Sequence, residues 1–109
     1  MPSYSKNDVI LVQYPFSDLS ATKVRPAVIV HTPHPSQDSL IVPLTSRTAA
    51  LLPGEFILTD WVAAKLNVPS AVKRGIYTVH PSLIVRLVGQ LSVQDAQQLE
   101  QSVRGWLGL

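Results

Sequence analysis

Two short apolar runs, residues 25–31 and 39–45, constrain the fold of this chain more than any other feature. A stretch of turn-forming residues, 32–38, separates them. Apolar runs of this length between turn signals are typical of β-strands, so we expect an antiparallel hairpin. If residue numbers sum to 70 across the ladder, Arg25 lies opposite Thr45 at the open end of the hairpin. A shift of the register by one residue would place the two side chains on opposite faces of the sheet. A guanidinium beside a hydroxyl indicates a site for phosphate or RNA.

Most of the remaining chain also has the pattern of strands. Pro26 and Pro43 each lack a ladder donor, so both are expected at a strand end, an edge or a bulge. Further short apolar runs predict strands at residues 8–14, 55–59, 72–79 and 83–91. Residues 61–67 are ambiguous and fit one or two helical turns. The chain is therefore predicted to be rich in β-structure.

The C-terminal segment has a helical pattern instead. Ser92 and Asp95 have the spacing of a capping box, with Asp in place of the usual Glu, and Gly108 is suited to end the helix. Apolar residues recur between them at helical spacing, at Val93, Ala96, Leu99, Val103, Trp106 and Leu107. Several strands followed by one amphipathic helix predict a single strand-rich α+β domain over residues 1–109.

The composition argues against several classes of protein. A hydrophobic content of 46% with only 15% charged residues argues against disorder. The chain has no cysteine, which excludes disulfides and thiolate metal sites and permits a reducing cytoplasm. No apolar run approaches the roughly 18 residues of a membrane span, and the first residues do not have the pattern of a signal peptide. His31, His34 and His80 lack other suitable ligands nearby in sequence, so no metal or other cofactor is expected.

The positively charged residues are the remaining indication that the chain binds an anionic partner. The net charge of +2 favours nucleic acid only weakly, and the distribution of the cations is more informative. A barrel-like fold could bring together Lys23, Arg25, Arg47, Lys73, Arg74 and Arg86.

Arg25 and Thr45 can be compared with the needs of RNA cleavage. Without a metal, the reaction needs a base for the 2′-hydroxyl, a stabiliser for the charged phosphorane and an acid for the leaving 5′-oxygen. The fixed donor fork of Arg25 suits the phosphorane, where one such donor contributes roughly 3–4 kcal/mol. Thr45 can donate a hydrogen bond to the same phosphate but is a poor base. The pattern alone favours a plainer interpretation, in which Arg25 is a solvated charge and Thr45 ends a strand.

Several motifs in order resemble one known family. Residues 7–19 include an apolar strand and the loop Pro-Phe-Ser-Asp-Leu, and residues 23–30 begin Lys-Val-Arg-Pro-Ala. Residues 42–47 form a strand that ends in Thr-Ser-Arg, and later landmarks follow at residues 53–55, 69–73 and 87–92. This succession is similar to that of the MazF/PemK (Kid) toxin family over nearly the whole chain.

The resemblance implies a fold, an activity and partners. The fold would be a small SH3-like β-barrel of the CcdB/MazF type with a C-terminal α-helix, usually a homodimer. The activity would be that of a cytoplasmic toxin that cleaves single-stranded RNA at short sequences without a metal, leaving 2′,3′-cyclic phosphate and 5′-hydroxyl ends. A small antitoxin would fill the RNA groove with an extended tail, and the two together could bind operator DNA. Arg25 and Thr45 would be catalytic, and residues 15–23 would form a flap.

Other polar residues are expected to contact the RNA: Lys23, Ser46, Arg47, Lys73, Arg74 and Asp18. One departure from the family concerns residues 70–80, where some members have an acidic residue and this chain has Lys73 and Arg74. The sequence therefore does not identify the general base, a role that typically raises the reaction rate by 10²- to 10⁴-fold. His80 and Asp18 are weak candidates for it. Tyr77 and Trp61 could stack on bases, although packing is the safer interpretation.

Two alternatives to the nuclease follow from the same residues. One is a non-enzymatic toxin like CcdB, which shares the fold and acts by binding a protein, because fold alone does not decide function. The other is a family member that only binds nucleic acid or regulates its own promoter, which the missing carboxylate makes conceivable.

Overall fold

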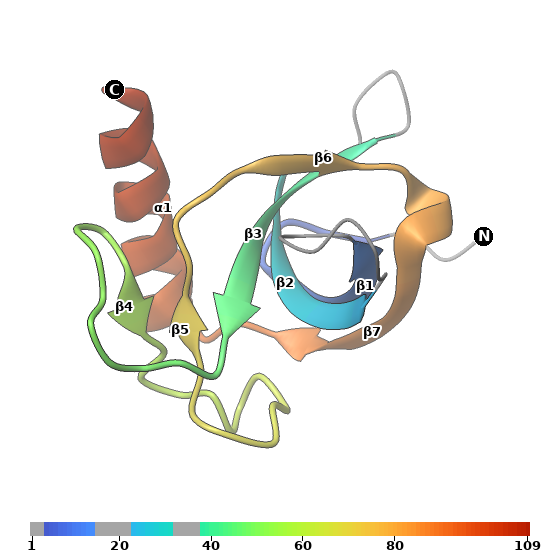
Figure 1. The fold of residues 1–109 in the computed structure, drawn as a ribbon, viewed down its shortest axis with the longest axis horizontal. Coiled ribbons are helices and arrows are strands. Elements are labelled where there is room, and N and C mark those ends of the chain that lie inside the picture. Colours follow the sequence, from blue (N-terminus) through green and yellow to red (C-terminus); the bar gives the residue numbers. More distant parts are fainter. Residues whose placement is uncertain (1–3, 15–22, 32–37) are drawn as a thin grey trace.

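The computed structural model describes residues 4–14, 23–31 and 38–109. Within them the chain forms an antiparallel sheet, a 3₁₀ turn and a C-terminal helix (Figure 1). The elements are β1 (Asp8–Tyr14), β2 (Lys23–His31), β3 (Ser39–Thr45), β4 (Phe56–Ile57), β5 (Ala71–Val72), β6 (Tyr77–Val79), η1 (Pro81–Leu83), β7 (Ile84–Gln90) and α1 (Val93–Leu107). The expected strand-rich α+β architecture is therefore confirmed.

The predicted hairpin register is correct, but its ladder stops short of its open end. β2 and β3 pair as Val28 with Val42 and as Ala27 with Pro43, so the residue numbers sum to 70. Beyond Pro43 the strands diverge, because β2 continues along β1 while β3 pairs with β5. Arg25 and Thr45 are thus not cross-strand partners; they lie on the two arms of a fork. Pro26 and Pro43 mark the end of the ladder, as the missing proline donors predict.

The central strands are buried on both faces, which explains the high apolar content of a small chain. Successive side chains of a strand point to opposite faces, and here both sets enter a core. Val9, Val28 and Val42 belong to the core beneath α1, whereas Ile10 and Ile29 belong to a second core on the other face.

The sheet has two free ends among the described residues. Its order is β4-β5-β3-β2-β1-β7, with β6 paired to the beginning of β3, so β4 and β7 are the terminal strands. β6 and β7 curve around the second core without pairing with each other (Figure 1). A closed barrel is therefore not confirmed.

Three segments differ from their predictions. The strand expected at residues 72–79 is divided into β5 and β6, because Gly75 has a φ of +143° that a strand cannot contain. The strand expected at 55–59 is reduced to β4. Residues 61–67 form turns rather than a helix, and Lys65 has a positive φ of 63°.

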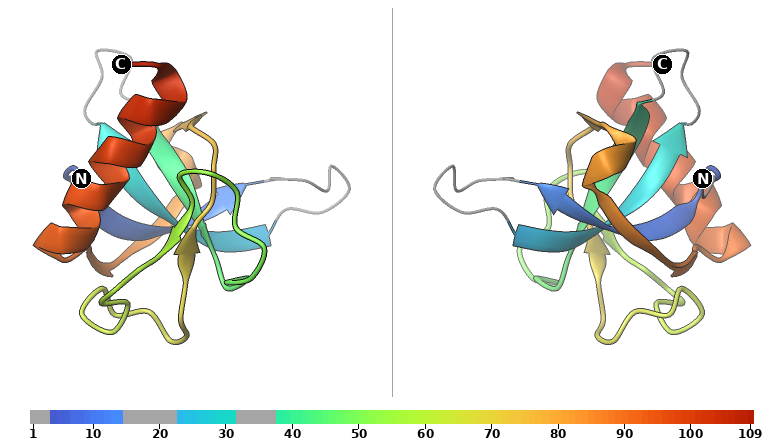
Figure 2. Two further views of the ribbon diagram at one scale, coloured as in Figure 1. Left: turned by 90° about the vertical axis from the view of Figure 1, so that its left-hand side faces the viewer. Right: turned by 90° about the vertical axis from the view of Figure 1, so that its right-hand side faces the viewer.

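The helix begins and ends where the sequence predicts. The Ser92 side chain accepts from the Asp95 N–H, and Gly108 ends the helix in the left-handed conformation. The Asp95 carboxylate does not complete a capping box; it accepts hydrogen bonds from Thr59 and Asp60. α1 crosses one face of the sheet (Figure 2) through Ala96, Leu99, Val103 and Trp106, while Val93 and Leu107 are exposed. No helix in the described ranges is long and apolar enough to span a membrane.

Candidate nucleic-acid interface

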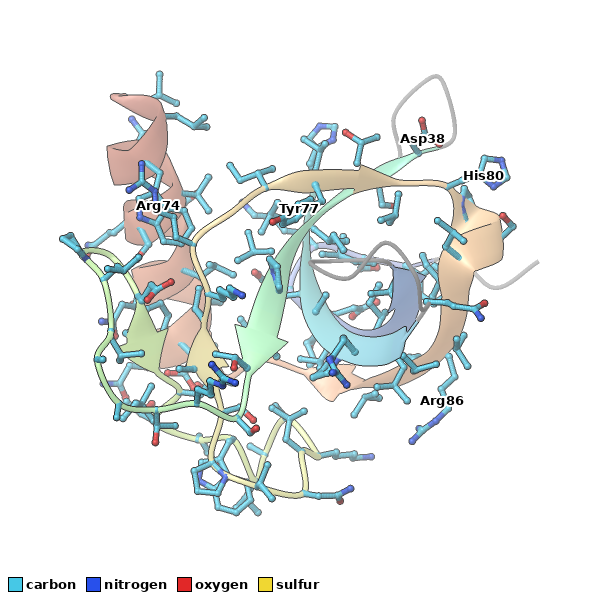
Figure 3. All side chains as sticks on the ribbon, in the orientation of Figure 1. Asp38, Arg74, Tyr77, His80 and Arg86 are labelled. Carbon is cyan, nitrogen blue, oxygen red and sulfur yellow. The ribbon has the colours of Figure 1, made fainter. Side chains whose placement is uncertain are left out.

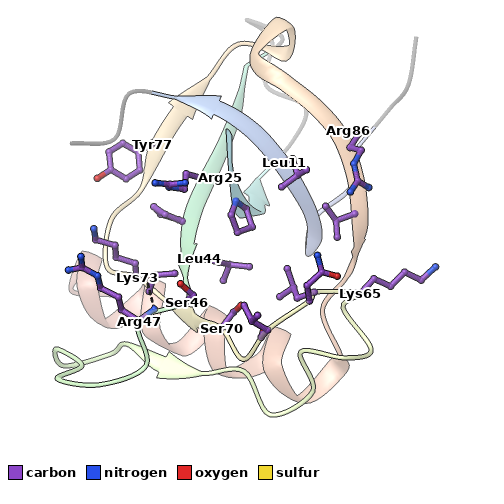
Figure 4. Close-up of a pocket in the computed structure, with 17 residues that line it drawn as sticks. Leu11, Arg25, Leu44, Ser46, Arg47, Lys65, Ser70, Lys73, Tyr77 and Arg86 are labelled. Atoms are coloured by element: carbon purple, nitrogen blue, oxygen red, sulfur yellow. Dashed lines mark hydrogen bonds between the residues drawn. The ribbon is translucent and has the colours of Figure 1, made fainter. Parts of the chain in front are cut away.

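A groove of about 800 Å³ opens at the fork between β2 and β3 (Figure 4). Arg25 and Thr45 both line it, on opposite arms of the fork. Five of the chain's nine lysine and arginine residues contribute to its walls: Arg25, Arg47, Lys65, Lys73 and Arg86. Apolar residues lie between them, including Leu11, Pro26, Pro43, Leu44 and Val88. The groove therefore combines a strongly positive rim with an apolar floor.

None of the five cations forms an ion pair in the part of the chain that the structure describes, although Lys73 lies near enough to Glu55 for their charges to interact. The ion pair found there is Lys6 with Glu100, on another face of the molecule. No Asp, Glu or His side chain lines the groove within the same described ranges. Uncompensated charges of one sign in a concave site attract an anionic ligand.

The Thr45 hydroxyl is held by a local turn. Its oxygen accepts a hydrogen bond of 3.1 Å from the backbone N–H of Arg47, drawn as a dashed line in Figure 4. This interaction uses an acceptor position and leaves the hydroxyl proton available to a ligand in the groove. The same turn places Ser46 and Arg47 on the groove wall. Thr45 is thus positioned as a hydrogen-bond donor.

Arg25 is exposed, and within the described residues its guanidinium makes no hydrogen bond or ion pair. Tyr77, at the start of β6, lines the groove on the same side as Arg25 (Figure 4) and packs against the second core. A free guanidinium can turn its donor fork toward a phosphate without first breaking a protein contact. Arg25 therefore has the freedom that a phosphate ligand requires.

Of the four expected RNA contacts whose side chains the structure describes, three line the groove and one does not. Ser46, Arg47 and Lys73 line the groove, whereas Arg74 does not and lies toward α1 (Figures 3 and 4). Asp18 and the side chain of Lys23 lie outside the described residues, so their expected RNA contacts stay predictions.

Glu55 is a carboxylate close in space to residues 70–80, but it is structural. It accepts hydrogen bonds from the backbone N–H groups of Leu52 and Arg74 and does not line the groove. Partial burial acts to raise its pKa, but these two donors, with the charges of Lys73 and Arg74, hold the pKa below the ordinary value of 4.5. Glu55 is therefore ionised at neutral pH, and its carboxylate is used by these backbone hydrogen bonds.

The histidines take no part in the groove as far as it is described. His80 caps η1, with its Nδ1 2.9 Å from the Ser82 hydroxyl and 3.1 Å from the Ser82 N–H, at the far side of β6 (Figure 3). His31 is exposed at the distal end of β2, and His34 lies outside the described residues. His80 is not placed to act as the base.

The sequence predictions missed two groove cations and one amide. Arg86 was expected among converging cations but not among RNA contacts, and Lys65 and Asn67 were expected in neither group. All three line the groove. No local pattern identifies Lys65, because its position depends on packing between residues 59–68 and β7 that joins distant parts of the sequence. Arg86 reaches the groove through the pairing of β7 with β1, in which it lies opposite Leu11, and this pairing joins distant parts of the sequence.

The fold is shared with solved mycobacterial structures. The Mycobacterium tuberculosis toxin MazF-mt6 superposes with a TM-score of 0.73 at 22% identity, over 94% of this chain and 97% of that chain. A mycobacterial endoribonuclease in complex with its cognate antitoxin gives 0.75 at 15% identity, over 98% and 97% of the two chains. A second mycobacterial endoribonuclease superposes with a TM-score of 0.75 at 16% identity, over 100% of this chain and 95% of that chain. A search of curated proteins finds no match.

At these identities the superpositions show a common fold, and membership of the family comes from the sequence. The model of the PemK-like, MazF-like toxins of type II toxin–antitoxin systems matches residues 5–107. That match spans both arms of the fork, the groove and the whole of α1. The chain therefore belongs to the PemK-like, MazF-like toxin family.

Proposed function

We propose that this protein is a sequence-specific endoribonuclease, the toxin of a type II toxin–antitoxin system. Its substrate is single-stranded RNA, and its products carry a 2′,3′-cyclic phosphate and a 5′-hydroxyl. The observation that carries the proposal is the placement of Arg25 and Thr45 on opposite arms of one groove that four further cations line. A phosphate between the arms would receive donors from both sides.

The two residues divide the task of stabilising the reacting phosphate. As the 2′-oxygen attacks, negative charge grows on the non-bridging oxygens, and the Arg25 fork can pair with two of them. The Thr45 hydroxyl can donate a hydrogen bond to the same group from a fixed position. Removing one preorganised donor of this kind typically lowers kcat by about 10²- to 10³-fold. Both donors are placed to stabilise the additional negative charge that develops on the phosphate during the reaction.

The groove also makes the 2′-hydroxyl easier to ionise. Nearby positive charges favour the deprotonated form of an acid and so lower the pKa of a hydroxyl held among them. Arg25, Arg47 and Lys73 surround the fork with such charges (Figure 4). A solvent water can therefore take the 2′-hydroxyl proton, and solvent can supply a proton to the leaving 5′-oxygen, in a groove whose described lining has no carboxylate or imidazole.

Metal independence is part of the proposal. Divalent cations in nuclease sites are held by carboxylates and phosphates. Here five cations would repel a metal ion, and the described residues contain no cluster of three or more potential metal ligands. The charge neutralisation that a metal would supply comes from Arg25 and its neighbours.

The partners and setting follow from the family and its neighbours. One structural neighbour is an endoribonuclease in complex with its cognate antitoxin, which supports a small antitoxin as partner here. Operator DNA bound together with the antitoxin and a cytoplasmic location belong to the same proposal. A homodimer is supported by the free edge of β7, where Val85 and Leu87 are exposed. Sedimentation equilibrium would distinguish a dimer from an 11.9 kDa monomer.

The decisive experiment incubates purified protein with a mixed single-stranded RNA in EDTA. We expect the wild type to cleave it, and Arg25→Ala and Thr45→Ala each to lose about 10²-fold or more in rate. Arg104→Ala, an exposed arginine on α1 outside the groove, is the matched control and should cleave normally. No cleavage by the wild type would refute the nuclease, and full cleavage by Arg25→Ala would refute the site. Cleavage that EDTA abolishes would refute metal independence.

One observation favours a second function. The described groove has phosphate-binding residues but no carboxylate or imidazole, which also suits a protein that binds nucleic acid without cutting it. The same experiment separates the two functions, because such a protein would retain the RNA intact in a gel-shift assay and lose binding in Arg25→Ala.

A further inference from the structure

A second cationic cluster lies across the groove from the fork. Lys65 and Arg86 line the side opposite Arg25, Arg47 and Lys73 (Figure 4). Both side chains are exposed, and neither makes an ion pair or side-chain hydrogen bond with any described residue. Two uncompensated cations at the end of a groove, away from the proposed reacting phosphate, require an explanation of their own.

Lys65 belongs to a segment whose beginning is anchored by a fully buried carboxylate. Asp95, on α1, accepts hydrogen bonds from the N–H and hydroxyl of Thr59, both at 2.9 Å, and from the N–H of Asp60 at 3.1 Å. Charge-assisted bonds to a buried acceptor are stronger than neutral ones. The start of residues 59–68 is therefore fixed to the helix rather than free in solvent.

The later part of this segment is fixed to β7. Gly89 has no side chain, and a Cβ there would lie 2.4 Å from the carbonyl oxygen of Ala64, so the segment packs directly on the strand backbone. Lys65 comes next, with a φ of 63° that costs a non-glycine residue on the order of 1 kcal/mol. Such conformations persist where the surroundings hold them, and they cluster at functional sites.

A row of paired residues across three strands separates Arg86 from the proposed reacting centre. Arg86 pairs with Leu11 on β1, and Leu11 pairs with Pro26 on β2. Two strand spacings of about 4.8 Å therefore separate the backbones of Arg86 and Pro26, the neighbour of Arg25. The apolar side chains of Leu11 and Pro26 form the floor between, which suits a nucleobase or sugar better than a phosphate.

From this arrangement we infer that Lys65 and Arg86 form a second phosphate subsite. It binds a phosphate of the same single strand next to the scissile one, while the nucleoside between them lies over the apolar floor. Asp95 and Gly89 are positioning residues that hold this wall in place before the RNA arrives. The inference rests on the proposed function for its substrate, but its binding test does not require cleavage.

The test measures binding of a fully 2′-O-methylated single-stranded RNA, which has no 2′-hydroxyl to attack, by fluorescence anisotropy at several salt concentrations. The variant is Lys65→Gln/Arg86→Gln, and the matched control is Arg74→Gln/Arg104→Gln, which removes the same charge outside the groove. We expect the first double variant to lower the slope of log K against log salt by about 0.7, the value for one phosphate contact on a single strand. The control should keep the wild-type slope. Equal slopes in the two double variants would refute the subsite.

A length series separates the subsite from the reaction itself. A dinucleotide has only the scissile phosphate, so Lys65→Gln/Arg86→Gln should cleave it as fast as the wild type. With a hexanucleotide the same variant should show a raised KM and an unchanged kcat. Equal losses on both substrates would overturn the inference. Both short RNAs contain the site that the wild type cuts in the mixed RNA. If the wild type cuts no RNA at all, the nuclease proposal fails, and the anisotropy slopes still decide the subsite.

Discussion

In the proposed reaction, Thr45 acts from a fixed position and Arg25 from a free one. The Thr45 oxygen is held by the Arg47 N–H, whereas the Arg25 guanidinium has no partner among the described residues. Arg25→Lys keeps the charge and loses the planar fork, so we expect kcat to fall about 100-fold while RNA affinity changes little. Single-turnover kinetics and anisotropy on the same RNA would measure the two effects. An unchanged kcat would show that Arg25 contributes only charge.

Two substitutions of Thr45 test whether its hydroxyl acts on the phosphate. Thr45→Ser keeps the donor and its turn, so its kcat should stay within about tenfold of the wild type. Thr45→Val keeps the shape and removes the donor, so its kcat should fall by about 10²-fold or more, as for Thr45→Ala. Equal kcat values for the serine and valine variants would show that the hydroxyl does not act on the phosphate.

Single residues differ in how far the sequence alone could place them. The predicted register, which β2 and β3 have at residues 27–29, placed Arg25 and Thr45 at the same end of the hairpin. The sequence did not indicate that the two strands diverge there, because the divergence depends on the pairing of β3 with the distant residues of β5. Lys65 was beyond prediction for a similar reason. Its positive φ occurs in a turn with local backbone hydrogen bonds, such as Lys65 N–H to Val62 O, but the placement of this turn depends on its close packing against Gly89 of β7.

At the scale of elements, long apolar runs were predictable and short ones were not. The bounds of β1 and β3 coincide with the predicted runs, since seven residues of mostly branched side chains leave little alternative to a strand. The strand expected at 72–79 was wrong because Gly75 turns the chain, so that β5 and β6 pair with opposite ends of β3. The helix was predictable from its caps, but the partners of Asp95 were not, because Thr59 and Asp60 are distant in sequence.

Asp95 connects α1 to the groove wall, which gives a prediction about stability. Asp95→Ala would leave three donors of Thr59 and Asp60 without their acceptor in a part-buried position. Unsatisfied donors of this kind cost about 1–3 kcal/mol each, so we expect the free energy of unfolding to fall by on the order of 3 kcal/mol. Urea denaturation followed by tryptophan fluorescence would measure it.

The control for Asp95 is a second carboxylate on the same helix. Glu100→Ala removes an exposed ion pair with Lys6 and should change the free energy of unfolding by less than about 0.5 kcal/mol. A loss of similar size in both variants would mean that Asp95 contributes only as a helix charge and does not anchor residues 59–68.

At the scale of the whole molecule, a modest net charge conceals a strong separation of charge. The chain has nine Lys and Arg against seven Asp and Glu, and five of the cations line the groove. The remaining four cations and seven anions give −3 for the rest of the molecule, against +5 in the groove. Lys23 and Asp18, whose side chains are not placed, cancel in this count. The electrostatic field therefore directs an anionic chain to one face.

This separation predicts that an acidic, partly apolar peptide competes with RNA for the groove, which is the property that a proposed antitoxin tail requires. Its carboxylates would contact the cations while its apolar side chains cover Leu11, Pro26 and Pro43 on the floor. A synthetic peptide of interspersed Glu and Leu should displace labelled 2′-O-methyl RNA, and displacement should weaken as salt rises. The same peptide with Gln in place of Glu is the control and should displace little. Displacement by both peptides alike would show that apolar contact, not charge, governs occupancy of the groove, whereas displacement by neither would exclude an acidic tail of this kind as the groove's ligand.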